Sequence, residues 1–135
     1  MLLPKGTVFA LVDGEQFELY RNEGLEAEPK LKAMPLPDLK KTNMSSGMRR
    51  HTHAGYSSDE QLDEDAHAIA VADWLNSQVL AHKIDKLVIA ADPRSLGEMR
   101  KRYHKELEEV LLCDLDRTLT GASTDDIVKI VRAAN

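Results

Sequence analysis

The sequence has a single cysteine, few aromatic residues and no long apolar run. Cys113 has no second cysteine to pair with, so an internal disulfide is excluded and a reducing compartment is favoured. Aromatic residues make up only 4% of the chain, which argues against a platform for stacked nucleobases. No apolar stretch reaches about 18 residues, and the first residues lack a signal-peptide pattern. We therefore expect a cytoplasmic protein without membrane insertion.

Positive charge is the scarcer sign in this chain. The sequence has 18 Lys and Arg residues against 23 Asp and Glu residues, a formal net charge of −5 at pH 7. This balance excludes a wholly basic coat for nucleic acid but does not exclude a local basic patch. An apolar content of 42% and a charged content of 30% are typical of soluble globular proteins. At this length we expect residues 1–135 to form a single domain.

The N-terminal part of the chain predicts three β-strands. Residues 7–13 and 15–21 are rich in β-formers, and the Asp13-Gly14 pair between them is typical of a hairpin turn. Residues 25–36 predict a weaker third strand. Pro29 confines this strand to a sheet edge or a bulge, because proline cannot donate a hydrogen bond to a neighbouring strand.

Residues 37–59 break the strand pattern and predict a long flexible loop. The segment contains Pro37, Gly47 and Gly55 together with many Ser, Thr and Asn residues. Loops of this length are usually functional or disordered. We expect residues 40–58 to be the most mobile part of the chain.

The rest of the chain alternates helices and strands. Ala68, Val71 and Leu75 recur at helical spacing, and Ser95 with Glu98 forms an S-x-x-E capping box at the start of a second helix. Short apolar runs predict strands that are buried on both faces. The expected elements are a helix over 59–82, a strand over 86–91, a helix from Ser95 to about Leu107, a strand over 110–115 and a last helix capped by Ser123 or Thr124.

The predicted element order is β-β-β-α-β-α-β-α, which indicates the α/β class. Three hairpin-linked strands followed by two strands with helical crossovers predict a mixed five-stranded sheet with residues 86–91 in its interior. This is the element order of the ribonuclease-H-like fold. The order by itself carries no information about chemistry.

The stretch VLLCDLDRTLTG has the shape of a haloacid-dehalogenase nucleophile motif. An apolar strand leads into Asp114, Asp116 and Thr118. A phosphatase of this type also needs a lysine and an acidic pair after further strands, and too little chain follows Asp116 to supply them. Asp125-Asp126 lies at a helix start, where acids favour the positive end of the helix dipole. A polar turn after a buried strand is the better interpretation.

A metal-dependent nuclease is the stronger enzymatic alternative. Ribonuclease-H chemistry requires several carboxylates that converge on two divalent metal ions. Asp13 ends the first predicted strand, Glu60 or Glu64 opens the first helix, and Asp92 ends the fourth strand. Asp13, Glu64 and Asp92 are therefore the candidate nuclease site. Structural roles compete with this assignment, because Asp13 suits a hairpin turn and Asp92 suits a helix cap.

No complete metal or cofactor motif is present in the sequence. His51 and His53 form an H-x-H pair, and Asp63 and His67 lie four apart on a predicted helix. Each pair could supply only half of a metal site. Phosphate-cradling glycine loops and Ser-His-Asp arrangements are absent, and Cys113 in its apolar strand is typical of an unreactive core thiol. We therefore expect neither a metal nor a cofactor.

Three stretches together resemble a known bacterial family. They are TVFALVDGEQFELYRN, LVIAADPRSLGEMRKRY and DLDRTLTGASTDDI, in this order. Over nearly the whole chain the sequence resembles the bacterial host-attachment protein family, and this implies a role in attachment to host cells. That family is similar in turn to the middle domain of archaeal and eukaryotic peptide-chain release factors. The residues that match the family motif are Asp13, Pro93, Arg94, Leu96, Gly97, Arg100, Asp116 and Thr120.

The resemblance does not bring the release-factor activity with it. The release-factor domain carries a Gly-Gly-Gln tip in the loop before its long helix. The corresponding stretch here, NMSSGMRRHTHAGYSSDE, contains Gly47, Arg49 and Arg50 but no Gly-Gly-Gln. Hydrolysis of peptidyl-tRNA is therefore not expected, whereas a basic loop in the same place is.

Two basic clusters stand out in this acidic chain. If they converge, they form a phosphate-binding face suited to RNA or to a ribosomal surface. Otherwise they are the solvated face of a helix and a loop. The candidate polyanion-binding residues are Lys40, Lys41, Arg49 and Arg50 in the loop, and Arg94, Arg100, Lys101, Arg102 and Lys105 in and after the second helix.

These patterns favour a non-enzymatic binding protein. Its expected partners are RNA, the ribosome, another protein or a second copy of the chain. A cytoplasmic protein would affect host attachment indirectly, through regulation or translation. The nuclease alternative depends on whether Asp13, Glu64 and Asp92 converge in space.

Overall fold

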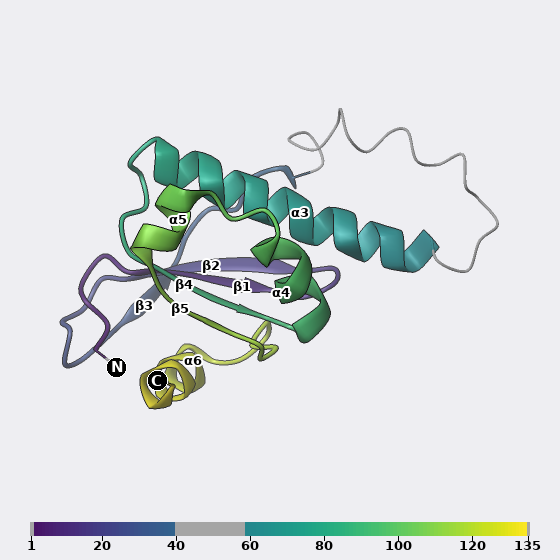
Figure 1. The fold of residues 1–135 in the computed structure, drawn as a ribbon. Coiled ribbons are helices and arrows are strands. Elements are labelled where there is room, and N and C mark those ends of the chain that lie inside the picture. The colour runs from purple at the N-terminus through teal and green to yellow at the C-terminus, as the bar shows by residue number, and fades with distance from the viewer. Residues whose placement is uncertain (1, 40–58, 135) are drawn as a thin grey trace.

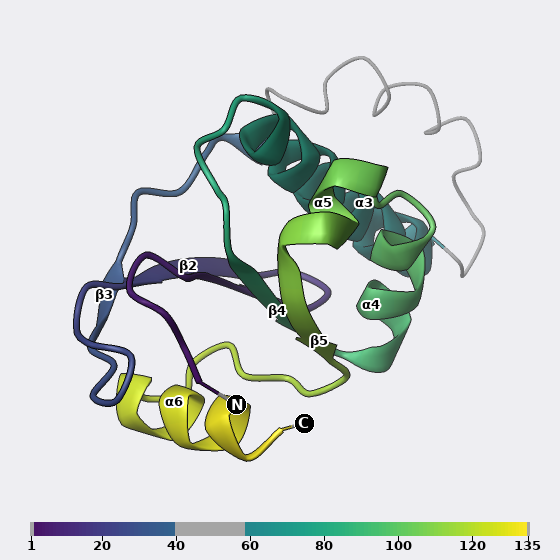
Figure 2. The same ribbon diagram turned by 60° about the vertical axis from the view of Figure 1, so that its left-hand side comes forward.

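A computed structural model describes residues 2–39 and 59–134, and for residues 59–62 it describes the backbone alone. A central sheet lies between two layers of helices, with α3, α4 and α5 on one face and α6 on the other (Figures 1 and 2). No helix in the described ranges is long and apolar enough to cross a membrane. The elements are β1 (Val8–Val12), β2 (Phe17–Asn22), β3 (Leu31–Ala33), α3 (Asp59–Leu80), β4 (Leu87–Ala91), α4 (Pro93–Arg100), α5 (Lys105–Val110), β5 (Leu111–Leu115) and α6 (Thr124–Ala133).

The sheet is mixed and has five strands in the order β3-β2-β1-β4-β5. β1 pairs antiparallel with β2 and parallel with β4, and β5 continues the parallel part at the edge. The predicted α/β class, the five-stranded mixed sheet and the interior position of the 86–91 strand are confirmed. β3 lies at the other edge, as the proline in its segment predicted.

β1 and β4 form the fully buried centre of the molecule. All five residues of each strand are buried, as expected of apolar runs covered on both faces. Their register sets Val8 opposite Leu87 and Val12 opposite Ala91, so the two strands end level with each other. Each strand is followed at once by an aspartate, which places Asp13 and Asp92 at the same edge of the sheet.

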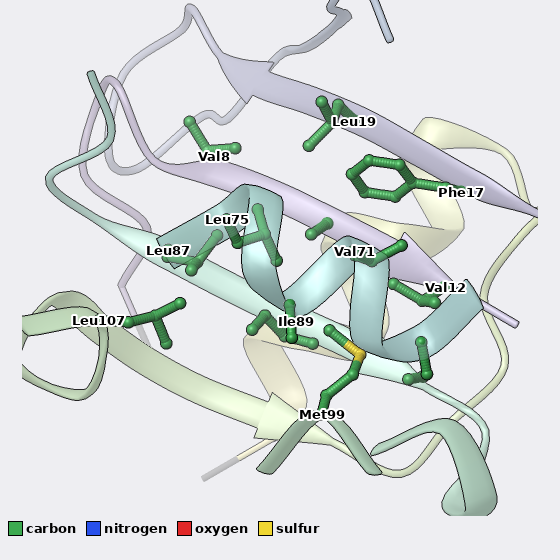
Figure 3. Packing of buried hydrophobic residues seen from close by; sticks show 14 of the residues in the cluster. Val8, Val12, Phe17, Leu19, Val71, Leu75, Leu87, Ile89, Met99 and Leu107 are labelled. Atoms are coloured by element: carbon green, nitrogen blue, oxygen red, sulfur yellow. The ribbon is translucent and has the colours of Figure 1, made fainter. Parts of the chain in front are cut away.

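Alternate residues of the central strands contribute to two separate cores. On the α3 side, Leu75 of α3 and Met99 of α4 pack with Ile89 of β4 in the cluster shown in Figure 3. On the α6 side, Phe9 of β1 packs with Ile127 of α6. Because side chains alternate along a strand, one strand serves both cores.

The segment predicted as one helix from Ser95 to Leu107 forms two helices, α4 and α5. The predicted capping box is wrong about the start: Asp92 is the N-cap of α4 and accepts a hydrogen bond from Ser95 N at 3.1 Å. Pro93 follows as the first helical residue, where proline is favoured. Asn76 of α3 interrupts the segment, because its side chain donates to Arg102 O and accepts from His104 N, both at 2.9 Å.

Two boundaries follow from local hydrogen bonds. Ser123, one of the two predicted caps, is the N-cap of α6 and accepts from Asp126 N at 3.1 Å. β3 is shorter than the predicted 25–36 strand because a turn occupies most of that segment. The buried side chain of Asn22 holds this turn by accepting from Gly24 N and Lys30 N, both at 2.9 Å.

Truncation of Leu87 should destabilise the fold more than an equal truncation at the sheet edge. Leu87 is fully buried, whereas Leu112 in the neighbouring strand is 38% exposed. We expect Leu87→Ala to lower the free energy of unfolding by about 2–5 kcal/mol and Leu112→Ala to lower it by roughly 1 kcal/mol or less. Urea denaturation of both variants measures the difference, and equal losses would contradict the assignment of β4 to the centre.

Candidate functional site

A pocket of about 340 Å³ lies where β1 and β4 end. In the sheet, β2 and β3 lie on one side of β1, and β4 and β5 lie on its other side. The order in which strands are added along the sheet therefore reverses between β1 and β4, where the pocket lies. Ligands of open α/β sheets bind outside the carboxyl ends of strands at such a point. The pocket is lined by Asp13, Gly14, Glu15, Gln16, Glu64 and Asp92.

The three candidate nuclease residues therefore meet in one pocket. Asp13 comes from the β1–β2 hairpin, Glu64 from α3, and Asp92 from the junction of β4 with α4. Gly14 permits the approach of Glu64, because a Cβ added to Gly14 would lie only 2.8 Å from Glu64 Cδ. A larger residue in the turn would displace either the hairpin or that carboxylate.

Both oxygens of Asp13 are occupied by hydrogen bonds. Oδ1 accepts from Glu15 N at 2.8 Å and Gln16 N at 2.7 Å, and Oδ2 accepts from the Thr120 hydroxyl at 2.6 Å. Burial raises the pKa of Asp13, but the hydrogen bonds from Thr120 and the two amides outweigh it and hold this pKa below its ordinary value of 3.8. Asp13 is thus a turn-forming carboxylate, as the hairpin sequence indicated.

The side chain of Asp92 also forms a hydrogen bond with the backbone. Its Oδ2 accepts the capping hydrogen bond from Ser95 N, while its Oδ1 is buried and has no hydrogen-bond partner among the described residues. The predicted structural role of Asp92 as a helix cap is confirmed.

The pocket does not assemble a metal site from the residues that the structure describes. No group of three or more His, Cys, Asp or Glu residues within the described ranges is arranged to hold a metal ion. His67 instead lies against the hairpin, with Nε2 at 3.1 Å from Gln16 O. The His51 and His53 pair lies outside the described residues.

The loop between β5 and α6 fastens the hairpin to the far end of the chain. Besides the contact of Thr120 with Asp13, Gly121 N donates to Glu18 Oε2 of β2 at 3.1 Å. Asp13 and Thr120 are 107 residues apart, and both were assigned to the family motif. Sequence reasoning missed Glu18, for which no local pattern gives a signal.

The described basic residues of the second cluster are mostly paired with carboxylates. Lys105 has no ion pair within the described ranges, and the loop residues Lys40, Lys41, Arg49 and Arg50 lie outside them, so convergence of the two clusters stays a prediction. The pairs are Arg94 with Asp65 at 3.0 Å, Arg100 with Asp114 at 2.9 Å, Lys101 with Glu98 at 3.0 Å, and Arg102 with Asp73 at 3.0 Å.

Comparison with protein-family models identifies the family of the chain. Residues 6–131 match the model of the bacterial archaeo-eukaryotic release factor family 12. The chain belongs to this family. No curated protein matches the chain. The predicted relation to release factors is confirmed at this level, whereas the host-attachment name stays a prediction.

The sequence contains no Gly-Gly-Gln, the tripeptide that the sequence resemblance would put in the loop before the long helix α3. The loop itself, residues 40–58, is outside the described residues, so its predicted mobility is not tested.

Asp114, which follows the apolar run of the stretch VLLCDLDRTLTG, is held by residues of α4 and of the turn that follows it. Asp114 accepts from Arg100 Nε at 3.0 Å and from the second guanidinium nitrogen of Arg100 at 2.9 Å, and the hydroxyl of Tyr103 lies 3.4 Å away. The hydrogen bond from Arg100 holds the pKa of Asp114 below its ordinary value. Burial raises the pKa of the neighbouring Cys113 thiol, which favours its protonated form.

Loss of the Thr120 hydroxyl should raise the pKa of Asp13. The hydrogen bond favours the ionised carboxylate, so its contribution to stability is full above the unfolded pKa of Asp13 and is lost as pH falls through the lower folded pKa. We expect Thr120→Val to lower the free energy of unfolding by about 1 kcal/mol at pH 7 and by less at acid pH. Carboxyl NMR titration and urea denaturation across pH measure both effects.

Thr118→Val is the matched control for this substitution. Thr118 is exposed and has no hydrogen bond within the described ranges. An Asp13 pKa that Thr120→Val and Thr118→Val leave equally unchanged would show that the Thr120 contact does not act in solution.

Proposed function

We propose that this family-12 chain is a non-enzymatic binding domain that contacts RNA, most naturally within the ribosome. The proposal rests on the family match over residues 6–131 in a chain without Gly-Gly-Gln. The release-factor relation supports a partner in translation, and the missing tripeptide argues against peptide release as the activity. The β3-β2-β1-β4-β5 strand order supports assignment to the ribonuclease-H-like topology.

The binding surface that we propose is α4 with the turn that follows it. The side chains of Arg94, Arg100 and Arg102 are 46%, 54% and 49% exposed despite their carboxylate partners. Arginine has five N–H donors, and a bidentate pair with a carboxylate leaves others for a phosphate. Exposed ion pairs contribute only about 0–1 kcal/mol, so a phosphate can compete with the carboxylate for each guanidinium.

The same carboxylates limit the affinity of this surface. Each one lowers the local positive potential, so binding would depend on exchange of partners or on Lys105 and the basic loop residues. A cytoplasmic location and an indirect effect on host attachment through translation are consistent with this proposal. A protein partner or a second copy of the chain is the alternative if no RNA binds.

Removal of a competing carboxylate should strengthen RNA binding. Asp73→Asn frees Arg102 for a phosphate and removes a negative charge from the surface. We expect tighter binding of single-stranded RNA, with a salt dependence steeper by about one phosphate contact. Fluorescence anisotropy across a salt series measures both quantities.

Glu26→Gln makes the same charge change at an exposed site in the turn before β3 and should have little effect. Equal strengthening by Asp73→Asn and Glu26→Gln would show a response to net charge alone. Absence of salt-sensitive binding by the unaltered chain would remove the RNA proposal and favour a protein partner.

A metal-dependent nuclease is the second candidate, because Asp13, Glu64 and Asp92 line one pocket. Two features argue against it. The oxygens of Asp13 are taken by three hydrogen bonds, and one oxygen of Asp92 caps a helix. A metal ion would have to displace these contacts, and the turn and the helix start depend on them.

We therefore expect no cleavage of RNA or DNA in the presence of Mg²⁺ or Mn²⁺. Gel assays of the chain with labelled RNA and DNA check this expectation. Cleavage that is lost in Asp92→Asn and kept in Asp116→Asn would establish the nuclease, since Asp116 is exposed and does not line this pocket.

A further inference from the structure

A second and larger cavity lies on the α6 side of the sheet. It has a volume of about 500 Å³ and is formed where β5 ends and the last turns of α6 pass beneath it. Figure 2 shows α6 on this face, opposite α3, α4 and α5. The volume is within the range of small-molecule sites, about 300–1,000 Å³. None of the residues that line it belongs to the pocket at Asp13.

The floor of this cavity is apolar and is part of the folded core. Leu115 of β5 and Ile130 of α6 both line it, and both pack against the buried cluster on the α6 side. Ala133 lies about one turn after Ile130 on the same side of the helix. Its small side chain leaves space above the floor, so the cavity can accept an aliphatic or aromatic group.

The rim of the cavity carries two cations that lack acidic partners in the described structure. Arg117 and Lys129 line the cavity, and neither forms an ion pair or a hydrogen bond with another described residue. This distinguishes them from the arginines of the α4 surface, each of which is paired with a carboxylate.

Two sources of negative electrostatic potential disfavour an anion in this cavity, and nearby positive charges offset both. Asp116 is the one carboxylate among the described residues that line the cavity, and it also acts electrostatically on Arg100. The carboxyl end of α6 carries a partial negative charge, which Arg132 in the last turn counters. The described rim carries two positive charges, on Arg117 and Lys129, and one negative charge, on Asp116, so its net charge is positive.

We infer that this cavity binds a small amphipathic anion, a molecule with one carboxylate or similar group and an apolar body. The apolar body lies on Leu115, Ile130 and Ala133, and the anionic group lies between Arg117 and Lys129. An extended nucleic acid does not fit these requirements, because its charges are spaced along a backbone and the floor offers no polar partner. The site is independent of the proposed RNA surface.

Octanoate is the probe for this inference, and 1-octanol is its neutral analogue. Titration of the full chain with each, followed by amide NMR shifts, should give saturable changes for octanoate at residues 115–117 and 129–134. We expect 1-octanol to bind roughly two- to fivefold more weakly than octanoate, because its hydroxyl forms no ion pair with the two cations. Octanol binding as tight as octanoate, or shifts elsewhere, would overturn the inference.

Two variants separate this site from its surroundings. Lys129→Ala should weaken octanoate roughly two- to fivefold. Lys105→Ala, the same change on the opposite side of the sheet, should leave octanoate binding unaltered. If the proposed function holds, Lys105→Ala should weaken RNA binding and Lys129→Ala should leave it unaltered. Failure of one proposal is therefore distinguishable from failure of the other.

Ala133→Leu tests the apolar part of the cavity without loss of the fold. Ala133 is exposed and leucine is a good helix former, so α6 should persist. The larger side chain should fill the cavity and remove saturable octanoate binding. An Ala133→Leu chain that is folded by circular dichroism and binds octanoate like the unaltered chain would exclude this cavity as the site.

Discussion

The parallel register between β1 and β4 is the constraint on which the rest of the structure depends. Val12 lies opposite Ala91, so the two buried strands end at the same level and each delivers an aspartate to the same edge. Both carboxylates then serve the backbone that leaves the sheet: Asp13 holds the hairpin, and Asp92 starts α4. Two of the acids in this pocket thus arise from strand geometry and serve the backbone, so their presence is weak support for catalysis.

Elements with a strong local pattern could be predicted from the sequence. β1 and β4 are unbroken apolar runs and α3 has a helical apolar stripe, so each was expected in its place. The division between α4 and α5 could not be predicted, because it depends on Asn76 from a distant helix. One amide side chain there satisfies two backbone groups that a continuous helix would have used itself.

The candidate site was predictable in part for the same reason. Carboxylates that end or open neighbouring elements were named as the alternative nuclease site, with their convergence left open, and Asp13, Glu64 and Asp92 do line one pocket. The hydrogen-bond partners of their carboxylate oxygens could not be predicted from local sequence patterns. The contact of Thr120 with Asp13 joins residues that only the closed sheet brings together, and it decides that Asp13 is satisfied by protein groups.

Charge pairing gives the basic residues of this acidic protein two different characters. Arg94, Arg100 and Arg102 form ion pairs with carboxylates on α3 and β5. These pairs hold the guanidinium groups in position and weaken the positive electrostatic potential around them. Such a surface can select a phosphate by geometry but cannot attract it strongly from a distance. Arg117 and Lys129, unpaired among the described residues, keep their field beside an apolar floor. The two proposed sites therefore differ in the anion that we propose for each: a polyanion that exchanges partners on α4, and a single charge with an apolar body at α6.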